Sequence, residues 1–240
     1  MMLFALACAG VVYAYPTLAG PTGMLVIPTG KIPPTGLQIA GDWYQLEHGD
    51  SVPVRALMTI GRGLEVGAMY DPFNAEAPLN QAWSANAKAS FARILGGDSA
   101  FGVIVRRDRD QQKVNTNYVQ GYFAWSTDFD ADKIDYSNIA FTAGVNWTRM
   151  KVGDEKAEYA LRAFSGATLY LTPQWLLMGE FQTKNTRVGD LEAMTAIGMR
   201  YRLNTDISIQ VGQTNALGLT AIREHKYFAG LNLTLPVKAQ

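Results

Sequence analysis

Two histidines are the only imidazole groups in the chain, and each stands beside acidic residues. His48 lies close to Asp50, and His225 directly follows Glu224. Imidazole and carboxylate groups can bind a metal ion or serve as general acid and base in a hydrolase, for which Ser51 is the nearest candidate nucleophile. The alternative, which we favour, is that His48 and His225 are exposed at a polar rim and that there is no metal site.

Sequence motifs of catalysis are otherwise missing. The chain has no Gly-x-Ser-x-Gly, no His-Glu-x-x-His and no phosphate-binding glycine loop. Gly61-Arg62-Gly63 fits a tight hairpin turn better than a phosphate site. We therefore predict a protein that is not an enzyme, with no catalytic residues and no cofactor.

The first residues are expected to form a signal peptide. Residues 1–12 are almost wholly apolar, and Val12-Tyr13-Ala14 suits cleavage after Ala14. The only cysteine, Cys8, lies in this segment, so we expect no thiol in the mature chain. A lipoprotein with Cys8 as its anchor is disfavoured, because Ala5 stands where Leu is usual.

Apolar and polar residues alternate along most of the remaining chain. Between Glu192 and Asn204, for example, Ile197 and Tyr201 share one face and Arg200 shares the other with Arg202. This period of two is typical of half-buried strands. Twelve such segments are predicted: 36–47, 52–61, 64–73, 81–94, 99–108, 116–128, 138–150, 156–171, 175–184, 192–204, 206–215 and 225–236.

Strand number and length favour a membrane protein. Bacterial single-chain barrels have an even number of strands, and strands of about ten residues can cross a bilayer when tilted. We therefore predict an all-β fold, a single antiparallel transmembrane β-barrel of 12 strands over residues 36–237. The expected connections at the outer end are 48–51, 74–80, 109–115, 151–155, 185–191 and 216–224. A soluble all-β binding protein is the alternative.

Charged residues within these strands fall on the less apolar face. In a membrane barrel this face lines the lumen, because Arg or Lys on the lipid face costs about 2–4 kcal/mol near the midplane. The candidate lumen-lining residues are Arg55, Glu65, Lys88, Arg106, Arg162, Glu180, Arg200 and Arg202.

Aromatic residues are expected to form belts at both membrane interfaces. The candidates for the outer rim are Trp43, Tyr70, Trp147, Tyr159 and Tyr227, and those for the periplasmic rim are Phe91, Trp125, Trp175 and Tyr201.

Residues 15–35, before the first strand, are rich in proline and glycine. Such a segment cannot form a regular helix. It contains a short apolar run, Met24, Leu25, Val26 and Ile27. Two interpretations stay open: a plug that enters the lumen through these four residues, or a periplasmic linker.

This segment and the hairpin after it also resemble a known family. Thr22-Gly23-Met24, Pro28-Thr29 and Gly36 match the amino-terminal motif of YjbH-like outer-membrane proteins, and Leu64-Glu65-Val66-Gly67 is similar to that family's next hairpin. The resemblance covers residues 20–70. It implies an outer-membrane barrel associated with exopolysaccharide production.

Three functions are compatible with the sequence. The first is a non-enzymatic outer-membrane barrel with an envelope-structural or exopolysaccharide-associated role, the second is a narrow passive pore for small solutes, and the third is an outer-membrane hydrolase. The expected partners are outer-membrane lipid, the barrel-assembly machinery and, as a further candidate, polysaccharide. Nucleic acid is not expected, because 21 basic and 21 acidic residues leave no net charge.

Overall fold

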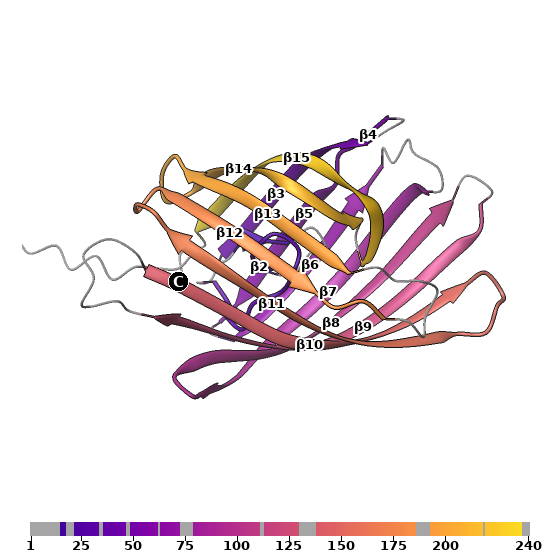
Figure 1. Ribbon diagram of the computed structural model, residues 1–240, viewed down its shortest axis with the longest axis horizontal. Coiled ribbons are helices and arrows are strands. Elements are labelled where there is room, and N and C mark those ends of the chain that lie inside the picture. Colours follow the sequence, from indigo (N-terminus) through magenta and orange to yellow (C-terminus); the bar gives the residue numbers. More distant parts are fainter. Residues whose placement is uncertain are drawn as a thin grey trace, which may run out of the picture.

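The computed structural model shows a closed antiparallel barrel (Figure 1). It describes residues 15–17, 22–33, 36–46, 49–61, 63–72, 79–110, 113–129, 138–185, 193–217 and 219–236. Each barrel strand pairs with the next along the chain, and the last pairs with the first. Within the described residues, no helix is long and apolar enough to cross a membrane.

Twelve strands form the wall of the barrel. They are β3 (Gly36–Leu46), β5 (Val54–Ile60), β6 (Leu64–Asp71), β7 (Leu79–Ile94), β8 (Gly97–Asp110), β9 (Asn115–Phe129), β10 (Asn138–Val152), β11 (Glu158–Tyr170), β12 (Trp175–Gln182), β13 (Met194–Arg202), β14 (Ile207–Leu217) and β15 (Thr220–Pro236). A short strand, β4 (Gly49–Ser51), pairs with the end of β3.

The predicted fold class is confirmed, and all twelve predicted strands are present. The largest error concerns the connection predicted at 216–224. It is a short turn, because β14 continues to Leu217 and β15 begins at Thr220. The two strands extend into the predicted connection, where Ala216 pairs with Ala221 and Leu217 with Thr220.

The barrel is closed by pairing between β15 and β3. Their register runs from Pro236 opposite Gly36 to Phe228 opposite Tyr44. Closure leaves neither of these strands as a free edge, which is a requirement for β structure in lipid. The end of the barrel that holds Gly36 and Pro236 is called the termini end below.

Burial is inverted relative to a soluble protein. In β5, Val54, Met58 and Ile60 are exposed, whereas Arg55 and Thr59 between them are buried. The same alternation occurs along β11 and β12. An apolar outer surface around a polar interior is the arrangement of a transmembrane barrel, so the soluble alternative is wrong.

Aromatic side chains lie on this outer surface in pairs. The rings of Trp147 and Tyr159 are stacked with centroids 5.6 Å apart, and those of Trp175 and Tyr201 lie 4.5 Å apart at the opposite end of the strands. Tyr159 is more than half exposed. These pairs stand where the two interfacial belts are predicted.

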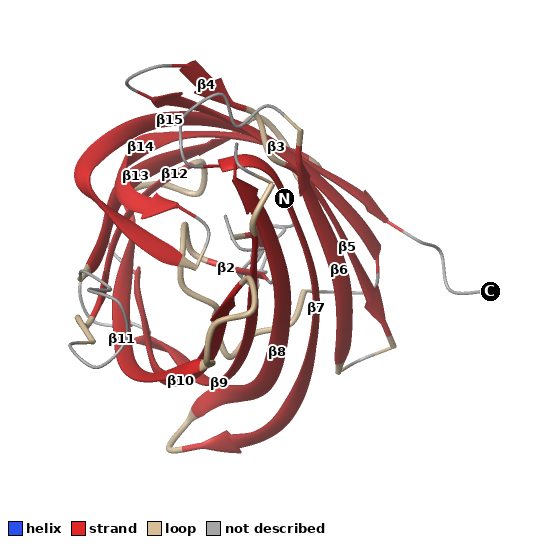
Figure 2. Ribbon diagram, turned by 90° about the vertical axis from the view of Figure 1, so that its right-hand side faces the viewer, coloured by secondary structure: helices blue, strands red, loops and turns tan. Residues whose placement is uncertain are grey.

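The segment before the barrel runs through its interior. Two short strands, β1 (Tyr15–Pro16) and β2 (Thr22–Gly23), pair with each other, and a bridge joins Gly23 to Pro28. Figure 2, a view turned by 90°, shows β2 surrounded by the barrel wall. We call residues 22–33 the inner segment.

A charge placed on the outer face tests this arrangement. Val145 lies at the middle of β10 and is about half exposed. Val145→Arg should lower the free energy of unfolding in lipid vesicles by about 2–4 kcal/mol, whereas Arg near an interface costs about 0–1 kcal/mol. Denaturant titration of the barrel folded in vesicles measures the difference. Tyr159→Arg, at a strand end, is the matched control, and equal effects of the two substitutions would contradict the membrane assignment.

Candidate functional site

The interior of the barrel holds the predicted lumen-lining residues. Arg55, Glu65, Lys88, Arg106, Arg162, Glu180 and Arg200 are all buried, and Arg202 is half-buried. They come from seven strands, and the alternation of each strand turns their side chains inward. Buried charges require partners, so their contacts define what the interior can do.

One network of polar side chains joins four strands, β13, β14, β3 and β5. Arg55 forms an ion pair with Asp42, and Asp42 also accepts a hydrogen bond of 2.8 Å from Gln210 Nε2. The Gln210 side-chain oxygen in turn accepts a hydrogen bond of 2.7 Å from Arg200 Nη2. Charges contributed by β3, β5 and β13 are thereby linked.

Two further ion pairs lie elsewhere along the wall. Lys88 Nζ is 3.6 Å from Glu65 Oε2, across the β6–β7 pairing, and Arg106 Nε is 2.7 Å from Asp108 Oδ1 in β8. Sequence reasoning missed Asp42 and Asp108 as interior residues. The signal was present, because Asp108 lies two positions after Arg106 and therefore on the same face of its strand.

Glu180 holds the apolar part of the inner segment. Its carboxylate accepts hydrogen bonds from three consecutive backbone N–H groups, those of Leu25, Val26 (2.8 Å) and Ile27 (2.9 Å). Successive N–H groups directed at one point form a nest for an anion. The carboxylate and the nest thus satisfy each other, and all of these residues are buried.

Basic and hydroxyl side chains hold the rest of the segment. Arg200 Nη2 donates to the Met24 carbonyl oxygen at 3.1 Å, and Lys88 Nζ donates to the Lys31 carbonyl oxygen at 2.7 Å. The Gly30 N–H donates to Ser126 Oγ at 2.8 Å. Backbone groups of the segment therefore bond to wall side chains from β7, β9, β12 and β13.

Two glycines of the wall make room for the segment. A Cβ atom on Gly166 would lie 2.9 Å from Met24 Sδ, and one on Gly198 would lie 2.9 Å from Leu25 Cδ1. Both distances are shorter than ordinary carbon contacts. The structure therefore places Met24, Leu25, Val26 and Ile27 in the interior, all buried, against a wall shaped to receive them.

At the end opposite the termini, the β14–β15 hairpin leaves the wall. The pairing register shifts after Thr214, and Asn215 then bonds β13 through its side chain: Oδ1 accepts from the Thr195 N–H at 2.7 Å and Nδ2 donates to the Ala193 carbonyl at 2.7 Å. Leu219 in the turn is buried, and its carbonyl oxygen accepts a 3.0 Å hydrogen bond from Arg162. The hairpin tip thus packs against interior residues.

Within the described residues, the structure brings no metal or hydrolase site together. His48 lies outside the described residues. His225 is exposed, with Nε2 2.6 Å from Thr195 Oγ1, and Ser51 is buried against Asp71. Among the residues that the structure describes, no three histidine, cysteine or acidic side chains are grouped to hold a metal ion.

No protein-family model matches the chain, and no curated protein matches its sequence. Solved structures share its fold. The KdgM porin in complex with disordered oligogalacturonate is 10% identical with a TM-score of 0.57, covering 82% of this chain and 98% of that one. The NanC porin is 12% identical with a TM-score of 0.56, covering 83% of this chain and 100% of that one. The Acinetobacter baumannii outer membrane protein Omp33 is 9% identical with a TM-score of 0.50, covering 85% of this chain and 98% of that one.

The chain is an outer-membrane β-barrel. The closed twelve-stranded wall, its apolar exterior and the shared fold agree on this point. The barrel therefore lies in the bacterial outer membrane, with the inner segment and the buried charges facing its lumen.

The Glu180 contact predicts that the inner segment can be loosened by one substitution. In a Cys8→Ser background, a cysteine at Val26 should be shielded from a water-soluble maleimide. Glu180→Ala removes the acceptor of three N–H groups and should raise the labelling rate at least about tenfold, because hydrogen bonds to charged groups contribute about 1.5–3 kcal/mol each. Phe181→Ala, on the outer face of the same strand, is the control. An unchanged labelling rate in Glu180→Ala would show that the carboxylate does not retain the segment.

Proposed function

We propose that the protein is a narrow passive pore for small hydrophilic solutes. The observation that carries this proposal is the charged interior. Buried ion pairs are often no more stable than well-packed apolar residues of similar volume, so stability alone does not account for Arg55, Lys88, Arg106 and Arg200 inside one barrel. A polar lumen is instead what a water-filled path requires. The shared fold of the KdgM and NanC porins supports the same proposal.

In this proposal the inner segment sets the width of the path. It occupies the lumen, where its N–H groups donate to Glu180 and Ser126 and its carbonyl groups accept from Arg200 and Lys88. These bonds are made by wall side chains and not by strand pairing, so in this proposal the segment can shift without unfolding the wall. The pore would conduct weakly while the segment is in place.

The filled lumen also supports a second candidate function. A barrel in which the inner segment never moves would not conduct and would serve an envelope-structural or exopolysaccharide-associated role. The resemblance of residues 20–70 to YjbH-like proteins supports this candidate.

Single-channel recording in planar bilayers separates the two functions. We expect the refolded protein to show small, steady conductance. Deletion of residues 22–33 should raise the conductance several-fold, because the segment no longer fills the lumen. The double substitution Arg200→Ala/Arg202→Ala should shift the reversal potential in a KCl gradient toward cation preference, since local charge sets the concentration of permeating ions.

The control is Ile209→Ala/Val211→Ala, which changes two exposed residues of β14 and should leave both quantities unchanged. A folded protein that never conducts, with or without residues 22–33, would contradict the pore and favour the structural role.

A further inference from the structure

The outer face of β8, β9 and β10 is basic at the end of the barrel opposite the termini. In β8 and β10, the residues that follow the exposed Val105 and Trp147 on the same face are basic. They are Arg107, Arg109, Arg149 and Lys151, which we call the outer basic surface. The pairing register places Arg107 and Lys151 on either side of Asn117 in β9, so their Cα atoms lie two strand spacings, about 10 Å, apart.

Aromatic side chains place this surface at the level of the lipid headgroups. Trp83 of β7 stands opposite Arg107, and Tyr159 of β11 stands opposite Arg149. Aromatic residues near strand ends on the outer face mark the membrane interfaces. Toward the membrane centre the same face is apolar, with Val103 exposed. The outer basic surface therefore adjoins side chains that contact the acyl chains of the lipid.

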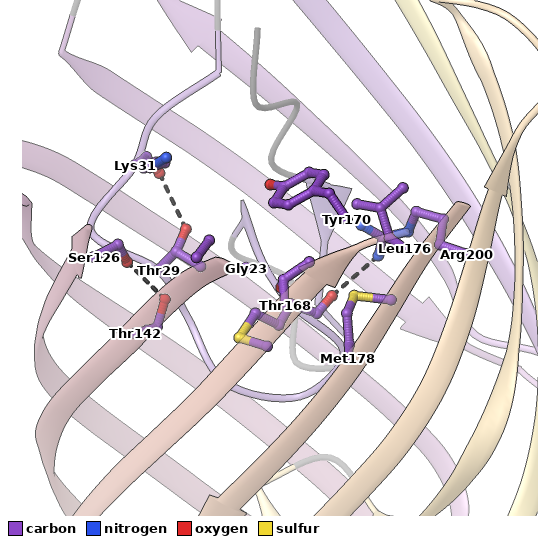
Figure 3. Close-up of a pocket in the computed structure, with 12 residues that line it drawn as sticks. Gly23, Thr29, Lys31, Ser126, Thr142, Thr168, Tyr170, Leu176, Met178 and Arg200 are labelled. Carbon is purple, nitrogen blue, oxygen red and sulfur yellow. Dashed lines mark hydrogen bonds between the residues drawn. The ribbon is translucent and has the colours of Figure 1, made fainter. Parts of the chain in front are cut away.

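The protein itself does not neutralise these charges. Basic side chains of the lumen bond inside the protein, as Arg200 does to the inner segment (Figure 3). On the outer face, Arg107 Nε donates to the neutral side chain of Asn117 at 3.0 Å. Among the described residues, no carboxylate forms an ion pair with any of the four basic side chains. Asp154 and Glu155, the acidic residues nearest to Lys151 in the chain, are exposed in the turn after β10.

The position of this surface matches the two sides of the outer membrane. The longest connection of the barrel, between β12 and β13, lies at the same end. Bacterial barrels have short periplasmic turns and longer extracellular loops, so this end faces the cell exterior. At the termini end, the exposed Arg93 already pairs with Asp98, with Nε 3.3 Å from Oδ1. In the described part of the barrel, unpaired basic side chains of the outer face thus gather on the side of the outer leaflet.

From these observations we propose that the outer basic surface binds a phosphorylated glycolipid of the outer leaflet, lipid A. This lipid carries phosphate groups on a disaccharide head and several acyl chains. Guanidinium groups bind phosphate through paired, charge-assisted hydrogen bonds, so Arg107, Arg109 and Arg149 would hold the phosphates. A soluble phosphate would use the cations alone, whereas the adjoining apolar face fits acyl chains. The site lies outside the lumen and does not depend on conduction.

Native mass spectrometry of the full barrel in an uncharged detergent, titrated with lipid, tests the site. The probes are diphosphoryl lipid A and the same lipid without its phosphates. Diphosphoryl lipid A should bind saturably, and the dephosphorylated lipid should bind at least about tenfold more weakly. The double substitution Arg107→Gln/Lys151→Gln should weaken binding of diphosphoryl lipid A about thirtyfold, the combined effect of two basic side chains beside an anionic headgroup.

Two isosteric variants make the test specific. Asn117→Asp places a negative charge between Arg107 and Lys151 and should weaken binding of diphosphoryl lipid A about tenfold. Gln213→Glu makes the matching change on the outer face of β14, on the other side of the barrel, and should have no effect.

Three results would overturn the proposal. One is binding of diphosphoryl lipid A that Asn117→Asp and the double variant leave unchanged, or that Gln213→Glu weakens equally. Another is equal binding of the dephosphorylated lipid. The third is displacement of the lipid by an equal concentration of inorganic phosphate, which would show a site for any phosphate. A heat-dependent shift in gel mobility confirms that each variant is a folded barrel.

Discussion

Every backbone N–H and C=O group of the wall must find a partner within the protein, because lipid supplies none. Pairing of β15 with β3 meets this constraint at the seam, over nine residue pairs from Gly36 and Pro236 to Tyr44 and Phe228. Where β14 turns away from β13, the side chain of Asn215 takes over the bonds that the backbone no longer makes. In the closed barrel, alternate side chains of each strand face lipid, and the side chains between them must fit inside the lumen.

The buried polar and charged side chains of the interior therefore need hydrogen-bond or ion-pair partners. Arg55 and Asp42, Lys88 and Glu65, and Arg106 with its neighbour in β8 pair across or along the wall. Glu180 has a different kind of partner, the backbone of the inner segment. The same segment supplies a carbonyl oxygen to Arg200. Wall and segment thus complete each other's hydrogen bonding. Without the segment, Glu180 and Arg200 would lose these partners, and without the wall the backbone groups of the segment would lose theirs.

Much of the wall could be predicted from sequence because strand periodicity is a local property. Alternation places Arg162 and Arg200 inward without knowledge of their partners. Contacts between distant parts of the chain were beyond such reasoning. Nothing local in the sequence near Glu180 indicates that its partners are Val26 and Ile27, more than 150 residues earlier. The inward course of the β14–β15 hairpin also depends on a distant contact, because the Asn215 side chain makes the hydrogen bonds to β13 and the residue before it that strand pairing would otherwise make.

The partners of the inner segment imply an order of assembly. The segment precedes β3 in the chain, yet it docks against β9, β12 and β13, whose contacts can form only when most of the wall exists. Contacts between residues so distant in sequence carry a large loop-closure cost and form slowly. The space beside Gly166 and Gly198, which Met24 and Leu25 occupy, likewise forms only when β11 and β13 have joined the wall. The inner segment is synthesised before the strands of the wall, yet it can reach its final position only after most of those strands have paired.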